Sequence, residues 1–211
     1  MDSRRAIRKR RRTRRVRAVL AAGLVLGIGT AATLAAWTDT ENATGSFGAS
    51  IFGTESESAA TPWGSHTSSP GASLTFNAAA MSPGNSYYAW MNVRTTTNSN
   101  VGGTVTLTGA LGSGAVAPAL QYRAVRITAP ASATTCNSGA FATGTPVFIA
   151  GGTGTYLGLS ALPATPVPSS IGAAGAALGY CFEVRMPSGT ANSFQGATGT
   201  ATWTFTATSA S

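Results

Sequence analysis

The chain has 211 residues, of which 9% are charged, and a formal net charge of +8. Ten of its 14 basic residues lie between Arg4 and Arg17, whereas the part beyond residue 36 carries four arginines against five carboxylates, a net charge of −1. The positive charge therefore belongs to a short head, and the remainder lacks the basic patch with interleaved aromatic residues that nucleic-acid binding needs.

An uncharged segment, residues 18–36, follows the basic head and contains only Ala, Gly, Leu, Val, Ile and Thr. A positive segment, an apolar run and small residues in this order are typical of a secretory signal peptide. We therefore expect an N-terminal signal helix in residues 1–36, with a basic head at 1–17, and cleavage between Ala36 and Trp37. An uncleaved membrane anchor is the alternative, since about 20 apolar residues span a bilayer. In both cases the positive-inside rule places the rest of the chain outside the cell.

Both cysteines, Cys136 and Cys181, lie in the part that is expected to be exported. An even number of cysteines in an oxidising compartment favours a disulfide, and two separate buried thiols are the alternative. Two cysteines and the distant His66 cannot supply the four ligands of a structural zinc site. We therefore expect a disulfide, no metal and no cofactor.

Short apolar or alternating runs between Gly, Pro and Asn residues recur through residues 37–211, whereas helical patterns are almost absent. In the clearest run, Thr198–Thr208, threonines alternate with apolar residues at the period of two that a half-buried strand requires. About eight such strands predict a single all-β domain, a sandwich of jelly-roll or Greek-key type. Loops are expected at Glu55–Pro70 and Ala164–Ala177. The other predicted strands are Ser46–Gly53, Ser73–Asn77, Tyr87–Thr95, Gly103–Gly109, Leu120–Thr128, Pro146–Ile149 and Gly179–Met186.

The residues offer no recognisable catalytic set. A zinc peptidase needs clustered His and Glu ligands, and His66 is the single histidine. A Ser–His–Asp set would have to use Asp39, close to the expected mature N-terminus. A glycosidase needs two placed carboxylates, whereas Glu183 is the only acid deep in a predicted strand, and Arg185 on the same face indicates an ordinary ion pair. We therefore expect a protein that is not an enzyme.

Three aromatic residues close together, Tyr87, Tyr88 and Trp90, are candidates for a platform that binds glycans. Alternation along a strand places Tyr88 and Trp90 on the side opposite to Tyr87. At least one side is therefore expected to pack in the core, and packing of all three is the alternative to ligand binding.

Two stretches resemble one class of exported proteins. Residues 35–39, AAWTD, combine small residues with an aromatic residue and an Asp, and residues 43–49, ATGSFGA, place a Phe among small residues. Further on, MSPG at 81–84 leads into a strand and then to Asn98. These features resemble the TasA-like and camelysin-like proteins, which are exported with an alternative signal that a SipW-type signal peptidase cleaves. The cysteine pair and the high content of Gly, Ala and Arg resemble those of the actinobacterial members of this class.

The resemblance implies a secreted or wall-associated jelly-roll subunit that assembles into extracellular matrix or biofilm fibres. In fibre-forming relatives the mature N-terminal segment completes the sheet of a neighbouring subunit, which is β-augmentation. The donor here would be residues 37–52, with Trp37, Phe47, Ile51 and Phe52 as its large apolar side chains. Pairing of this segment within its own subunit is the alternative.

The expected partners are the SipW-type signal peptidase during export and further copies of the chain, with membrane contact only through the signal segment. Two other functions remain open. One is a monomeric extracellular module that binds a glycan or a surface partner. The other is a camelysin-like peptidase, an activity that the resemblance alone implies.

Overall fold

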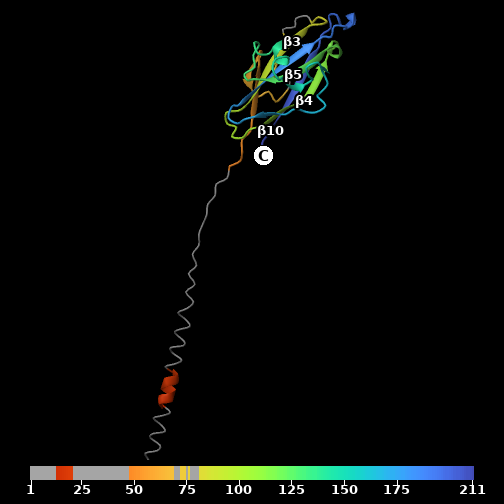
Figure 1. The fold of residues 1–211 in the computed structure, drawn as a ribbon. Coiled ribbons are helices and arrows are strands. Elements are labelled where there is room, and N and C mark those ends of the chain that lie inside the picture. Colours follow the sequence, from red (N-terminus) through yellow and green to blue (C-terminus); the bar gives the residue numbers. More distant parts are fainter. Residues whose placement is uncertain (1–12, 21–47, 69–71, 75, 77–80) are drawn as a thin grey trace, which may run out of the picture. The chain divides into compact units, whose positions relative to one another are not determined.

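The computed structural model describes residues 13–20, 48–68, 72–74, 76 and 81–211. The expected cleavage site, Ala36 and Trp37, therefore lies outside the described residues. Residues 13–20 are helical, and among the described residues no helix is long and apolar enough to span a membrane. The chain divides into two units, Met1–Phe47 and Gly48–Ser211, and the second is built from two layers of strands (Figure 1).

The larger sheet has seven antiparallel strands in the order β2-β1-β3-β9-β5-β6, with β7 also pairing with β5. Its centre is formed by the three strands β3, β9 and β5, and Glu183 of β9 lies between Tyr88 of β3 and Arg123 of β5 in register. The strands are β1 (Thr54–Ser58), β2 (Thr61–Gly64), β3 (Ser86–Thr95), β5 (Gln121–Ile127), β6 (Val147–Ala150), β7 (Leu157–Gly158) and β9 (Ala177–Arg185).

The smaller sheet has three antiparallel strands in the order β10-β4-β8. They are β4 (Gly103–Ser113), β8 (Ser169–Ile171) and β10 (Thr200–Ser209), and three 3-10 turns lie outside the sheets: η1 (Ala117–Ala119), η2 (Ser138–Phe141) and η3 (Asn192–Phe194). The register of β10 against β4 shifts between Thr204 and Phe205. Gly109 lies at this bulge, where a Cβ atom would come within 2.9 Å of the Thr204 Cβ, so the absent side chain permits the close approach.

Aromatic rings fill the space between the two sheets. Trp203 of β10 lies 5.2 Å from Tyr122 and 4.8 Å from Phe182, centroid to centroid, and Phe205 lies 4.8 Å from Tyr180. Such tilted pairs at 4.5–7 Å add stabilisation beyond the area that they bury. The apolar residues that alternate with threonines in β10 therefore face the core, as period two predicts.

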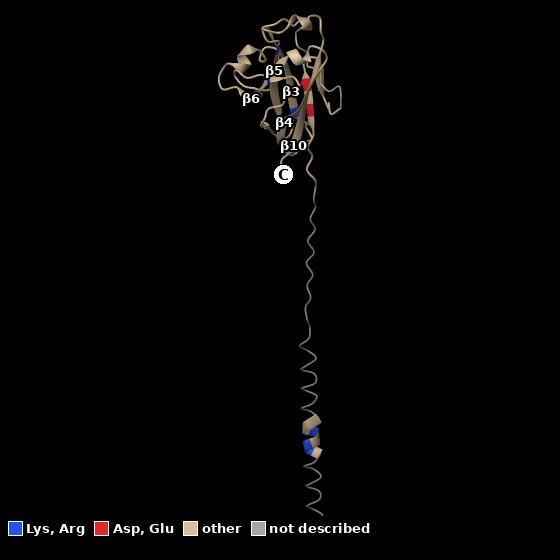
Figure 2. Ribbon diagram, turned by 90° about the vertical axis from the view of Figure 1, so that its right-hand side faces the viewer, with Lys and Arg blue, Asp and Glu red and all other residues tan. Residues whose placement is uncertain are grey.

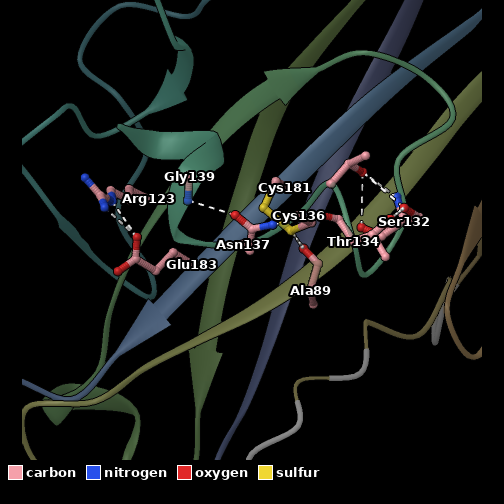
Figure 3. Close-up of a disulfide and its surroundings, with 10 residues drawn as sticks. Ala89, Arg123, Ser132, Thr134, Cys136, Asn137, Gly139, Cys181 and Glu183 are labelled. Carbon is pink, nitrogen blue, oxygen red and sulfur yellow. Dashed lines mark hydrogen bonds and ion pairs between the residues drawn. A yellow bond between two sulfur atoms is a disulfide. The ribbon is translucent and has the colours of Figure 1, made fainter. Parts of the chain in front are cut away.

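A second apolar cluster covers part of the opposite, outer face of the larger sheet. It contains Val125, Phe141 and the cysteines Cys136 and Cys181. The two sulfur atoms form a disulfide, with the Cα atoms 5.1 Å apart, which confirms the predicted bridge. The bridge ties residues 128–146, which connect β5 to β6, onto β9 (Figure 3).

The structure confirms an all-β sandwich of antiparallel sheets but has ten strands rather than about eight. Residues 48–53 and the described residues 73, 74 and 76 are not strands, and the remaining residues of those two predictions lie outside the description. The predicted loop Glu55–Pro70 instead contains β1 and β2, and Ala164–Ala177 contains β8. The sequence does not predict β1, because Ser and Thr alternate with Glu in this strand and neither of its faces is apolar.

Stability at alkaline pH should depend on Tyr122. Burial raises the pKa of Tyr122 to about 12, and its hydroxyl donates to the Ala161 carbonyl over 2.8 Å. A tyrosine in the unfolded chain ionises near pH 10. Between these values the unfolded chain loses a proton that the folded chain keeps, so the free energy of unfolding falls by about 2 kcal/mol as pH rises from 9 to 12.

The measurement is urea unfolding at several pH values for the wild type and for Tyr122→Phe. The variant should lose this part of the pH dependence while keeping the part that comes from the other tyrosines. Identical slopes for the two proteins above pH 10 would contradict the prediction.

Candidate functional site

Polar and charged side chains gather on the outer face of the larger sheet. Ser86 of β3, Arg123 of β5 and Glu183 of β9 share this face, because their strands are in register and side chains alternate between faces. Figure 2 shows how few charged residues the strands of the compact unit carry. A cluster of this kind is therefore the first place to look for chemistry.

The Glu183 carboxylate is the centre of the cluster, and only 2% of its side chain is exposed. Its Oε1 atom accepts hydrogen bonds from Ser86 Oγ at 2.6 Å and from Tyr156 Oη at 2.9 Å. Its Oε2 atom accepts from Arg123 Nε at 2.7 Å and forms an ion pair with Arg123 Nη2 at 2.6 Å. Both oxygens are thus fully engaged, as a buried carboxylate requires.

The Arg123 guanidinium, which faces Glu183 in Figure 3, is enclosed in the same way. Its Nη1 atom donates to the Gly152 and Thr153 carbonyls at 3.3 and 2.7 Å. The Arg123 Cζ atom lies 4.6 Å from the centroid of the Phe141 ring and 4.7 Å from the centroid of the Tyr156 ring. The ion pair therefore holds the turn at 151–156 against the sheet, which is a structural task.

Arg185 does not pair with Glu183, so that prediction was wrong. Arg185 Nε and Nη2 donate to Gln121 Oε1 at 3.1 and 2.9 Å, and the guanidinium lies 3.3 Å from the Tyr156 ring centroid. The side chains of Glu183 and Arg185 leave the same face of one strand side by side and do not point toward each other. Arg123 instead lies directly opposite Glu183 on the neighbouring strand. The sequence offers no sign of this pairing, because it depends on which strands are neighbours.

Tyr156 stays protonated in this environment. Burial raises its pKa above the ordinary value, and the hydrogen bond to Glu183 and the charge of that carboxylate raise it further, against the lowering effect of the two arginines. The phenol is therefore a donor to Glu183 and not a base. Burial, followed by the Glu183 charge, also raises the pKa of Tyr88.

The three aromatic residues proposed as a glycan platform lie on two different faces of the sheet, as the alternation predicts. Tyr88 and Trp90 lie opposite Glu183 and Cys181 in register and pack against the outer cluster, and the Tyr88 and Phe141 ring centroids are 6.0 Å apart. Tyr87 lies opposite Val184, which belongs to the core between the sheets. The structure thus brings Tyr88 and Trp90 together beneath the segment that the disulfide holds.

One serine contacts the single histidine. Ser56 Oγ and His66 Nδ1 are 3.0 Å apart. No carboxylate within the described ranges forms a hydrogen bond or ion pair with His66, and Asp39 lies outside them. Among the same residues no group of His, Cys, Asp and Glu could hold a metal ion. The pair is a polar contact between β1 and the loop after β2.

The proposed donor segment is described only at its end, since Trp37 and Phe47 lie outside the described residues. Ile51 is 54% exposed and Phe52 is half-buried. The Ile51 N–H donates to Asn100 Oδ1 at 2.8 Å, and the Ile51 carbonyl accepts from the Asn100 N–H at 3.1 Å. Gly53 makes similar bonds with Thr96 and Ser99. Residues 51–53 are therefore attached to the turn that follows β3.

The ion pair can be tested with two substitutions of the same kind. Glu183→Gln leaves Arg123 buried without a counter-charge and should lower the free energy of unfolding by about 3–5 kcal/mol. Glu55→Gln is the matched control, because Glu55 and Arg94 form an ion pair at 2.8 Å with side chains 29% and 33% exposed. It should cost less than about 1 kcal/mol.

Urea unfolding at neutral pH measures both effects. Equal losses for the two variants would show that the buried pair does not hold the turn at 151–156. Replacing both partners, as Arg123→Met with Glu183→Leu, should recover part of the stability, since no unpaired charge then remains.

Comparison with known proteins adds no relative: no protein family matches the chain, and no curated protein shows significant similarity to it.

Proposed function

We propose that the chain is a secreted or cell-surface structural protein whose compact unit accepts a β-strand from a neighbouring copy. The observation that carries the proposal is strand β10. It pairs with β4 along ten residues on one side, and no other described strand pairs with its opposite side. An unpaired edge presents a row of N–H and C=O groups to any extended chain.

The edge strands β2, β6 and β8 are protected. β2 has four residues and contains Pro62, β6 has four residues and follows Pro146, and β8 has three residues and follows Pro168. Short edges and prolines are the devices by which proteins prevent unwanted strand pairing. β10 has ten residues with neither a proline nor a charge. Residues 106–113 of β4 are also open on one side, because β8 pairs only with Gly103–Val105, but among the described strands β10 has the longer open side.

The outer side of β10 also favours close approach of a second chain. Its exposed residues are the five alternating threonines from Thr200 to Thr208 and the last residue, Ser209. Threonine is β-branched, so these residues keep the strand extended in the absence of a partner. No charge on the strand opposes a neighbouring subunit.

The expected mature segment is long enough to act as the donor. Because residues 51–53 are bonded to the turn at 96–100 of their own subunit, residues 37–50 are those that can reach a neighbour. Fourteen extended residues span about 46 Å, whereas a strand of ten residues needs about 33 Å. The segment can thus pair along β10 and still leave a short connection.

Export is supported by the disulfide, since such bonds persist in oxidising compartments. We expect the protein recovered from culture medium to begin at Trp37 and to weigh two hydrogen atoms less than its reduced form. Intact-mass measurement with N-terminal sequencing tests both statements. A chain that keeps Arg4–Arg17 and occurs only in membranes would replace the secreted subunit by an anchored surface domain.

Assembly can be tested by adding charge to the edge. Thr202→Glu with Thr208→Glu places two carboxylates on β10, where they repel Asp39 and Glu41 of the proposed donor segment and so oppose pairing. The concentration at which filaments or large oligomers form should rise by about tenfold. Sedimentation velocity and electron microscopy of the recovered protein provide the measurement.

The matched control is Thr134→Glu with Thr165→Glu, which adds the same charge to exposed loop positions outside both sheets. It should assemble as the wild type does, and so a general effect of charge is separated from an effect at the edge. A wild-type protein that stays monomeric at all concentrations would contradict the proposal.

A further inference from the structure

A shallow groove of about 520 Å³ lies where residues 128–146 leave the larger sheet and return to it. One wall is formed by Arg126 and Ile127 at the end of β5 and by Thr128, which follows them. The chain that leads into β6 provides Thr143 and Thr145, and β6 itself provides Val147. Gly139 and Ala140 of η2 also line the groove. It is distinct from the buried cluster around Glu183.

The groove contains the one arginine of the compact unit whose side chain has no partner among the described residues. Arg94 pairs with Glu55, Arg123 pairs with Glu183, and Arg185 bonds to Gln121. Arg126 makes no hydrogen bond, ion pair or ring contact within the described part of the chain, although its charge acts on the buried Tyr180 hydroxyl. No carboxylate lines the groove, so this positive charge is uncompensated there.

Hydroxyl groups surround the same space. Thr128, Thr143 and Thr145 are exposed, and none of their side chains forms a hydrogen bond with a described residue. Val147, which is 40% exposed, adds an apolar contact. Arg126, three threonines with free hydroxyls and one apolar side chain line the same groove, a combination that matches a ligand with an anionic group on a hydroxylated carbon chain.

The groove is built before any ligand arrives. The disulfide ties Cys136 to β9, and Asn137 Oδ1 accepts a hydrogen bond from the Gly139 N–H at 2.8 Å (Figure 3). The Thr143 N–H in turn donates to the Gly139 carbonyl at 2.9 Å. A preformed site spares the ligand the cost of ordering a loop.

We propose that this groove binds the carboxylate or phosphate of a hydroxyl-rich polymer, with Arg126 as the anion-binding residue and the three threonines as ligands for hydroxyl groups. The planar guanidinium forms two parallel hydrogen bonds with either anion, which an ammonium does not. The inference is independent of strand exchange, because the groove lies beside β6 in the larger sheet and β10 belongs to the smaller sheet.

The test is an NMR titration of the ¹⁵N-labelled full chain with two probes, trigalacturonate for the carboxylate and glycerol phosphate oligomers for the phosphate. Neutral maltotriose serves as a ligand control. We expect shifts confined to the amides of residues 126–128 and 139–147 with at least one anionic probe. Arg126→Gln should weaken that binding by about tenfold, since bonds to a charged group contribute this much.

Arg94→Gln is the matched control, because it removes the same charge from the exposed pair with Glu55. The basic head at Arg4–Arg17 is identical in both variants, so its own attraction for anions cancels in the comparison. Arg126→Lys should recover only part of the affinity, and Thr143→Val with Thr145→Val should weaken binding without changing the charge.

The response to the two probes identifies the source of the anion: a sugar carboxylate, a polyol phosphate, or both. The proposal is overturned if neither probe shifts the amides of the groove, if Arg126→Gln binds as the wild type does, or if Arg94→Gln loses as much affinity as Arg126→Gln. The last result would show attraction to net charge alone.

Discussion

Strand β9 is buried on both of its faces, and much of the architecture follows from this constraint. Tyr180 and Phe182 on one side and Cys181 and Glu183 on the other are all at most 2% exposed. A strand in this position needs a cover on each side, since an exposed apolar face would cost the stabilisation that burial provides. The smaller sheet covers one face, and the segment that the disulfide ties down covers the other.

The two faces of β9 differ in polarity, so different interactions hold the segments that cover them. Between the sheets, aromatic rings from β10 pack on those of β5 and β9. On the outer face a carboxylate and a guanidinium are buried together, and each is enclosed by hydrogen bonds from neighbouring strands and turns. Burial of this pair requires every partner to be present, so the cluster positions the chain segments that supply those partners.

The two binding surfaces that we propose therefore rely on groups that are not needed to cover β9. One is the free side of β10, which is uncharged and runs along a strand of ten residues, whereas the edge strands β2, β6 and β8 are short and contain or follow a proline. The other is the groove beside β6, where the connection that covers the outer face turns back towards the sheet and Arg126 stays unpaired. An extended partner chain suits the first, and an anionic hydroxylated ligand suits the second.

The sequence by itself determined the all-β class, most of the long strands, the inward side of β10 and the cysteine pair, because period two and an even cysteine count are local or compositional signals. It could not determine β1, β2 or β8, which are short or have no apolar side. The partner of Glu183, the packing of Tyr88 and Trp90 under the tied segment, and the isolation of Arg126 were decided only by tertiary structure. Each depends on which strands become neighbours, and strand order is set by the packing of the whole sheet rather than by any stretch of the chain.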